Sequence, residues 1–205
     1  LYVRTSVRLL LQGPFLSGNA QMSSALSQSG LIPLKSPYAD DPRTVSRIPS
    51  NTTDWVLLQF RATTNGPALF SRSVFLRKDG WLVNDAGMPL LDADLPPDES
   101  FYVSVKHRNH LAALTSSPVS FTNQVLTVDF TGSPETYFGG EAVCVPVTGT
   151  NGVSWALRAG DTDGDGAVLD IDRTIWASQT DSTLGYRRTD MNLDGMVTSA
   201  DEEKI

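Results

Sequence analysis

Two twelve-residue segments late in the sequence repeat one pattern of oxygen-bearing side chains. They cover residues 161–172 and 190–201, and each has Asp or Asn at positions 1, 3, 5 and 12 and glycine at position 6. This is the ligand spacing of calcium loops of the EF-hand type, in which position 7 adds a backbone carbonyl oxygen. The pattern therefore predicts two bound calcium ions, and it requires the chain to bend around each of them.

The expected ligands follow from these positions, because Ca²⁺ is a hard cation that takes about six to eight oxygen atoms. For the first ion they are Asp161, Asp163, Asp165, Ala167 through its carbonyl, and Asp172. For the second they are Asp190, Asn192, Asp194, Met196 through its carbonyl, and Asp201. A single loop of this kind is often only a solvated turn, but two loops with the same spacing favour a metal site.

The duplication also resembles a known family. Equivalent positions of the two loops are 29 residues apart, and aspartate replaces the more usual glutamate at both twelfth positions. These features look like the dockerin module of bacterial cellulosomal and cell-surface proteins. The resemblance implies two calcium ions, a small α-helical domain over residues 159–205, and docking onto a cohesin module. Positions 10 and 11, Asp170-Ile171 and Ser199-Ala200, depart from the hydroxyl pair with which that family usually contacts cohesin.

The preceding residues, 1–158, have the alternation of apolar and polar residues that is typical of β-strands. Such stretches occur at residues 3–11, 54–63, 69–78, 101–107, 126–130 and 142–147, and Asp79-Gly80 gives a strong hairpin signal. Residues 77–105 also resemble a prealbumin-type extracellular repeat. We therefore expect a mainly β fold, an antiparallel β-sandwich (Ig-like or prealbumin-like) with a barrel as the alternative, followed by the helical calcium domain from residue 159.

The charge of the chain limits its partners and its location. Seven of the 23 acidic residues occupy calcium-ligand positions, and the remaining 16 equal the 16 lysines and arginines. Without a basic stripe the chain is not expected to bind nucleic acid, and its apolar runs are too short for membrane insertion. Calcium loops of this type fill where calcium is abundant, which favours an extracellular or cell-surface location. The dockerin resemblance implies that the cell is a bacterium.

Other chemistry-bearing residues have ordinary structural explanations. His107 and His110 would lie on opposite faces of a strand and could meet only through a turn at Arg108-Asn109. Cys144 is expected in the core, and the acids at 92, 94, 98 and 99 are expected to be solvated. Trp55, Trp81, Phe101 and Tyr102 could form a sugar-binding platform, although aromatic residues on strands are usually core. With no phosphate loop, zinc spacing or nucleophile elbow, the sequence is not that of an enzyme.

The sequence therefore indicates a non-catalytic, calcium-stabilised structural or assembly module. Three uses remain open. The protein could self-assemble by exchanging its strand at residues 3–11 with a neighbouring copy. It could anchor its β domain to a cohesin module, or it could bind carbohydrate through exposed aromatic residues.

Overall fold

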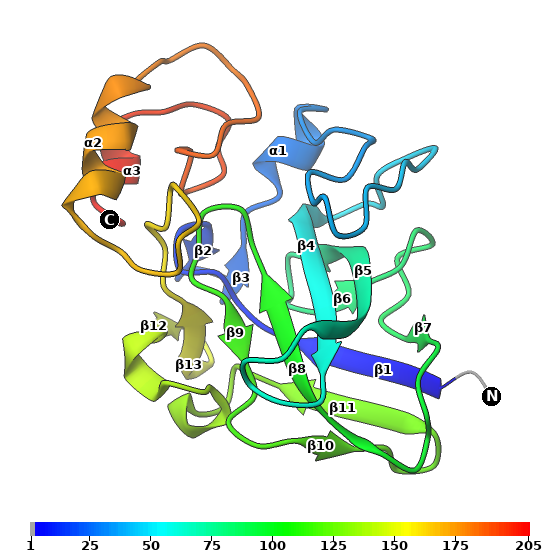
Figure 1. Ribbon diagram of the computed structural model, residues 1–205. Coiled ribbons are helices and arrows are strands. Elements are labelled where there is room, and N and C mark those ends of the chain that lie inside the picture. Colours follow the sequence, from blue (N-terminus) through cyan, green and yellow to red (C-terminus); the bar gives the residue numbers. More distant parts are fainter. Residues whose placement is uncertain (1–2) are drawn as a thin grey trace.

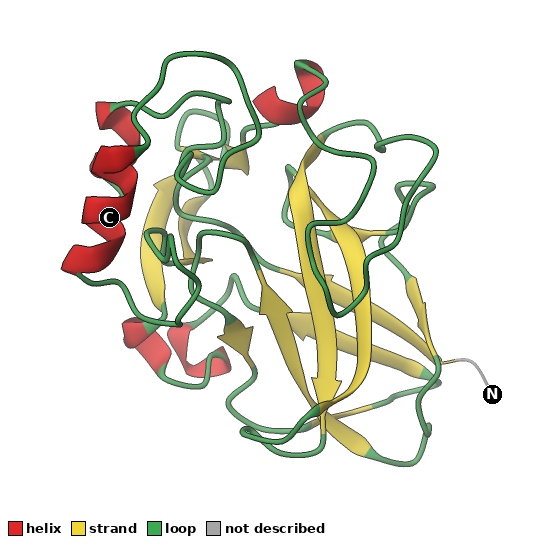
Figure 2. Cartoon of the chain, turned by 45° about the horizontal axis from the view of Figure 1, so that its top comes forward, coloured by secondary structure: helices red, strands yellow, loops and turns green. Residues whose placement is uncertain are grey.

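Alternating apolar residues form a mainly β fold in the computed structural model, which describes residues 3–205 (Figure 1 and Figure 2). The strands are β1 (Val3–Arg8), β2 (Phe15–Leu16), β3 (Gln21–Met22), β4 (Thr52–Arg61), β5 (Ala68–Arg77), β6 (Leu82–Val83), β7 (Leu91–Ala93), β8 (Ser100–Lys106), β9 (Ala113–Leu114), β10 (Val119–Ser120), β11 (Val125–Asp129), β12 (Cys144–Gly149) and β13 (Gly152–Leu157). The helices are α1 (Ala25–Gln28), α2 (Asp170–Ser178) and α3 (Ser199–Glu202), with short 3-10 turns at Pro134–Thr136 and Gly140–Ala142.

The largest sheet has the strand order β10-β8-β4-β5-β6, with β9 also paired to β8. Its centre is the long antiparallel hairpin of β4 and β5, in which Trp55 faces Phe75 and Phe60 faces Phe70. All residues of β4 except the last are buried, so both faces of this strand are covered. One face packs on the apolar core, whereas the end that carries Asp54 and Trp55 contacts loops, through Tyr38 and Tyr186.

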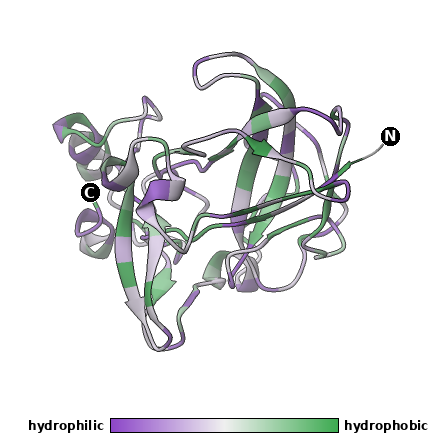
Figure 3. Ribbon diagram, turned by 90° about the horizontal axis from the view of Figure 1, so that it is seen from below, coloured by the Kyte–Doolittle hydropathy of each residue, from purple (hydrophilic) through white to green (hydrophobic). Residues whose placement is uncertain are grey.

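A second sheet has the order β11-β1-β7 and lies beside the first in Figure 1. Strand β1 is its middle strand, and Val7 pairs with Val128 of β11 in a parallel arrangement, whereas Thr5 pairs with Leu91 of β7 in an antiparallel one. Strands β2 and β3 form one further two-stranded ladder, and β12 and β13 form another. Figure 3 shows that the hydrophobic residues gather along these strands.

The mainly β character is confirmed, but the predicted architecture is wrong. Instead of an antiparallel Ig-like or prealbumin-like sandwich, the structure has curled sheets, one of which contains the parallel β1–β11 pair. Period-two alternation identifies a strand and its buried face, but it carries no information on which distant strand lies beside it or in which direction. The parallel pair joins segments about 120 residues apart, and no local pattern in either segment indicates its partner.

The predicted dockerin-like helical domain is also wrong. After β13 the described chain contains only α2, of nine residues, and α3, of four residues, joined by long loops. Helix α2 ends where the sequence changes to Gln-Thr-Asp-Ser-Thr, residue types that favour turns over helix interiors. The hypothesis that the protein docks onto a cohesin module was inferred from the dockerin resemblance alone and loses that support.

The second acidic loop is instead packed against the β part of the molecule. Met191 and Leu193 are buried, and Leu193 belongs to the main apolar core. A Cβ atom on Gly13 would lie 1.8 Å from the carbonyl oxygen of Met191, so the two segments touch backbone to backbone. Apolar side chains of the second loop thus cover the β core. The division of the chain at residue 158 stays a prediction.

Candidate metal site and adjoining pocket

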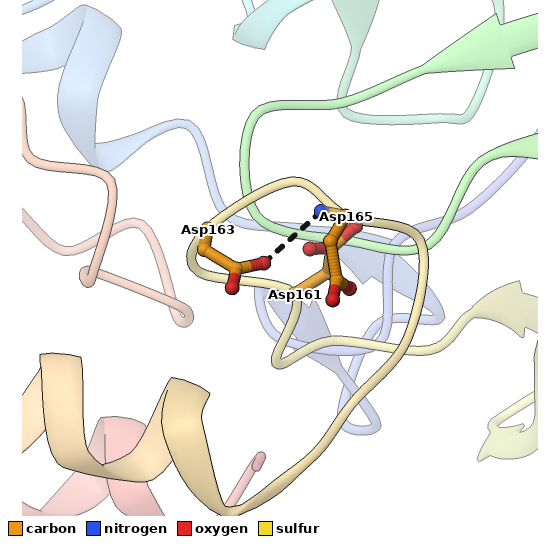
Figure 4. A group of neighbouring side chains, drawn as sticks. All are labelled: Asp161, Asp163 and Asp165. Atoms are coloured by element: carbon orange, nitrogen blue, oxygen red, sulfur yellow. Dashed lines mark hydrogen bonds between the residues drawn. The ribbon is translucent and has the colours of Figure 1, made fainter.

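The first acidic loop brings three of its predicted ligands together. Carboxylate oxygens of Asp161, Asp163 and Asp165 lie within 4.8 Å of one another (Figure 4). The loop backbone holds them there, since Asp161 accepts hydrogen bonds from the amides of Gly164 (2.7 Å) and Gly166 (3.3 Å). Gly166 has a φ of +90°, a conformation that glycine adopts without strain. Hard carboxylate oxygens in this arrangement suit a divalent cation such as calcium, magnesium or manganese.

Asp172, the predicted ligand at position 12, lies outside this group of three. Its Oδ1 accepts hydrogen bonds from the amides of Thr162 (2.7 Å) and Asp163 (3.3 Å), and its Oδ2 accepts one from the amide of Leu169 (2.8 Å). This buried carboxylate therefore closes the loop and starts helix α2. The roles of Asp172 and of the Ala167 carbonyl as metal ligands stay predictions.

The second loop repeats six of the first loop's backbone hydrogen bonds at equivalent positions. Amides at positions 2, 3 and 9 donate to the position-12 carboxylate, the amide at position 6 donates to position 1, and those at positions 5 and 7 donate to positions 3 and 5. In the second loop the donors are the amides of Met191, Asn192, Thr198, Gly195, Asp194 and Met196. In the first they are those of Thr162, Asp163, Leu169, Gly166, Asp165 and Ala167. The sequence duplication is therefore a structural duplication.

The two loop–helix units also contact each other. Asp181 and Val197 exchange a pair of backbone hydrogen bonds of 2.9 and 2.8 Å. Trp176 of α2 donates its indole N–H to the Thr198 carbonyl at 3.2 Å, and Arg173 pairs with Glu202 of α3 at 2.6 Å. Backbone, side-chain and ion-pair contacts thus join the two units.

Burial makes the ionised acids of these loops costly. Desolvation raises the pKa of Asp190 to about 7, against the opposing effect of Arg108, and burial also raises the pKa of Asp161 and of Asp201. Asp190 and Asp201 are fully buried. A bound cation would favour the ionised carboxylates and relieve this cost.

A buried polar network beside the loops was not predicted from the sequence. At its centre is Asp54, fully buried, which pairs with the Arg108 guanidinium at 2.8 Å and contacts His107 Nε2 at 3.2 Å. Its other carboxylate oxygen accepts a hydrogen bond of 2.7 Å from the hydroxyl of Tyr186. Burial raises the pKa of Asp54, but Arg108 and the hydrogen bonds outweigh it and lower the pKa to about 2. Asp54 is therefore ionised at neutral pH.

The histidine pair, His107 and His110, belongs to this network. The two rings meet through a turn at Arg108-Asn109, the alternative that the sequence left open, because β8 ends at Lys106 and the histidines do not lie on a strand. The two Nδ1 atoms lie 3.0 Å apart. Burial lowers the pKa of both histidines, so both are neutral at pH 7.

Hydrogen-bond partners assign the tautomers of the pair. The Gly13 amide can only donate, and it reaches His110 Nε2 at 3.2 Å, so the His110 proton is on Nδ1. That proton faces His107 Nδ1 and the Asn109 side-chain oxygen. His107 therefore carries its proton on Nε2 and donates it to Asp54.

The turn at residues 107–110 also binds the second loop to the β part of the molecule. Asn109 donates from Nδ2 to the carbonyl oxygens of Arg188 (2.9 Å) and Asp190 (2.6 Å). Arg108 donates from Nη1 to the Arg187 carbonyl. Residues 107–110 thus connect the centre of the large sheet to the start of the second acidic loop.

A cavity of about 570 Å³ lies between the histidine pair and the first acidic loop. Its wall includes two tyrosines, three basic residues and two acids of the loop: Tyr38, Tyr186, Lys106, Arg108, Arg188, Asp161 and Asp165. None of the basic residues or tyrosines of this wall was singled out as a site residue from the sequence.

The remaining candidates fit their structural explanations. Cys144 is buried and its Sγ lies 3.3 Å from the Gly140 carbonyl oxygen, as expected for a core residue. Trp55 and Phe101 are fully enclosed, so the four aromatic residues form no exposed platform. The acids at 92, 94, 98 and 99 are exposed.

Comparison with known proteins gives no relative, because no family model, no curated protein and no solved structure matches this chain. No helix among residues 3–205 has the length and apolar character needed to cross a membrane.

Proposed function

We propose that the protein is a non-catalytic calcium-binding module in which two ions stabilise the fold. The observation that carries this proposal is the duplicated loop: two segments with the same spacing of oxygen-bearing side chains share six backbone-to-side-chain hydrogen bonds at equivalent positions. The convergence of Asp161, Asp163 and Asp165 on one point supports it. Unpaired carboxylates so close together repel one another, and a divalent cation removes that repulsion.

Calcium would stabilise more than the loops themselves. Leu193 of the second loop is part of the apolar core, and Asn109 holds the carbonyl of Asp190. An ion that fixes this loop therefore also fixes the cover of the β core and the turn that carries the histidine pair. Such a dependence is consistent with an extracellular or cell-surface location, where calcium is abundant, and we propose that location for the module.

Calorimetry and thermal unfolding test the proposal. Titration with CaCl₂ is expected to give two binding events. At a calcium concentration about 100-fold above Kd, each bound ion adds about 2.7 kcal/mol. Each ion therefore raises the melting temperature by about 5–10 °C relative to EDTA for a chain of this size.

Variants assign each event to a loop. Replacing Asp165 by alanine is expected to remove the first event and replacing Asp194 by alanine the second, whereas Asp98→Ala, an exposed acid outside the loops, leaves both intact. Absence of binding heat together with an unchanged melting temperature in EDTA would show that the loops are only solvated turns.

Self-assembly by exchange of β1 stays a prediction. In the structure β1 is a middle strand with both edges paired, so exchange requires that its pairings with β7 and β11 both open. Sedimentation velocity with and without calcium tests it, and a monomer under both conditions would exclude this use.

A further inference from the structure

The cavity beside the first acidic loop has the make-up of a ligand pocket. Its volume of about 570 Å³ is in the range of small-molecule sites, which are commonly about 300–1,000 Å³. It is partly open and is lined by segments far apart in the sequence: the loop with Tyr38, the end of β8, the first acidic loop and the segment that carries Tyr186 and Arg188. Each segment is held by the contacts described above, so the pocket is preformed.

The basic residues of the wall are available to an anion. Within residues 3–205, neither Lys106 nor Arg188 forms an ion pair or a side-chain hydrogen bond. The Arg188 guanidinium lies against the backbone of the first loop, since a Cβ atom on Gly164 would come within 2.0 Å of its Nη2. It therefore stands at the border between the acidic loop and the cavity.

Arg108 adds an unsatisfied donor. Its side chain is 7% exposed, its Nε bonds Asp54 and its Nη1 bonds the Arg187 carbonyl. Its Nη2 is buried and has no hydrogen-bond partner in the described chain, the one such side-chain atom among the residues of this wall. A buried donor without a partner costs free energy, and it belongs to a residue that lines the pocket.

The tyrosines supply an apolar surface. The hydroxyl of Tyr38 is bonded to the Trp55 carbonyl, and that of Tyr186 to Asp54. Because both hydroxyls are engaged inside the protein, the rings are what these residues offer to a ligand. Arg108 stacks on the Tyr186 ring with its guanidinium carbon 4.3 Å from the centroid, which fixes that ring in place.

We propose that this pocket binds a small molecule that combines a carboxylate with a ring. The carboxylate pairs with Lys106 and Arg188, and the ring packs on Tyr38 and Tyr186. Asp161 and Asp165 in the same wall favour a single negative charge over the higher charge of a phosphate. Binding does not depend on the calcium proposal, since neither basic residue is a proposed metal ligand; calcium in the first loop would strengthen it by neutralising the two acids.

Ligand-observed NMR on the full chain tests the pocket with defined probes. Benzoate and D-glucuronate are expected to bind in the millimolar range, on the order of the affinity of small fragments. Benzamide and D-glucose, which keep the rings and lack the charge, are expected to bind at least about tenfold more weakly. Each titration is run in EDTA and again in CaCl₂, with inorganic phosphate as a further probe.

Matched variants locate the binding. Arg188→Gln and Lys106→Gln are each expected to weaken benzoate by about tenfold. Their controls are Arg47→Gln, an exposed arginine elsewhere, and Lys78→Gln, a half-buried lysine that follows β5 as Lys106 ends β8. The controls are expected to bind as the parent chain does, and melting curves establish that all four variants are folded.

The outcomes separate this inference from the proposed function. Carboxylates that bind no better than their neutral analogues, phosphate that binds more tightly than benzoate, or equal losses in variants and controls would each overturn the pocket proposal. Carboxylate binding in EDTA without any calcium heat would overturn the calcium function and leave the pocket standing. Calcium heat without carboxylate binding would do the reverse.

Discussion

Replacement of Asp54 by asparagine should destabilise the fold strongly, although the two side chains have nearly the same shape. In the native chain the Asp54 carboxylate neutralises Arg108 at 2.8 Å and accepts hydrogen bonds from His107 and Tyr186. The amide retains one acceptor oxygen for Tyr186, but its NH₂ group faces two donors. Breaking a buried ion pair in this way costs about 3–5 kcal/mol, because a buried charge is left without compensation.

A change of tautomer cannot absorb the substitution. If His107 moved its proton to Nδ1 in order to accept from the new amide, that proton would point at the protonated Nδ1 of His110, 3.0 Å away. If His110 in turn moved its proton to Nε2, it would meet the N–H of Gly13. Each rearrangement moves the conflict one step along the network, so the full cost is expected to appear in the stability.

Urea unfolding followed by tryptophan fluorescence measures this cost, in saturating calcium for every variant. The control is Asp85→Asn, which removes an exposed partner of Arg43 and is expected to cost about 0–1 kcal/mol. Typical domains are stable by about 5–15 kcal/mol, so Asp54→Asn should lower the urea midpoint markedly. A loss below about 1 kcal/mol, equal to that of the control, would refute the argument that Asp54 holds this network together.

Two further predictions concern pH and the contact between the N-terminal segment and the second loop. In saturating calcium, the free energy of unfolding should fall as the pH falls below about 6.5. Burial lowers the pKa of the histidine pair, so the unfolded chain binds protons that the folded chain excludes. The free energy can fall by at most about 1.4 kcal/mol per pH unit for each histidine. In EDTA the raised pKa of Asp190 has the opposite effect on stability and should flatten the dependence of the urea-derived free energy of unfolding on pH. A flat dependence in saturating calcium would contradict the conclusion that the histidines are neutral. Gly13→Ala places a Cβ atom 1.8 Å from the Met191 carbonyl oxygen and should lower the free energy of unfolding by about 1–3 kcal/mol. The control is Gly18→Ala, whose Cβ atom would have nothing within 4 Å and causes no clash. Equal urea midpoints for the two alanine variants would show that the loop does not rest on Gly13.

The acidic loops were the most predictable part of the molecule, for a physical reason. Their hydrogen bonds join residues two to ten positions apart, so the spacing of the acids is enough to specify the backbone path. The Asp54 network is the opposite case, because its members come from positions 54, 107 and 186 and have no common local pattern. Strand periodicity likewise identified most of the longer strands but not their neighbours.

One sequence signal bears on the helical domain that the structure lacks. Positions 2 and 4 of the first loop are Thr162 and Gly164, whereas the second loop has Met191 and Leu193 there. Apolar residues at these positions indicate that the second loop faces a core. In this loop Leu193 has a left-handed backbone conformation with a φ of +58°. The burial gained by a large apolar side chain exceeds the cost of that conformation.

The central position of β1 has a consequence for biosynthesis. Val7 pairs with Val128, so about 120 residues must be added before its parallel partner exists, which takes about 6–24 s at the usual rate of about 5–20 residues per second. Until β7 has been made the nascent strand exposes two unpaired edges, and after that its β11 edge stays unpaired together with the face that carries Val3, Thr5 and Val7. Ribosomes translating one message close together would hold several such strands near one another, and pairing between nascent chains would then compete with correct folding.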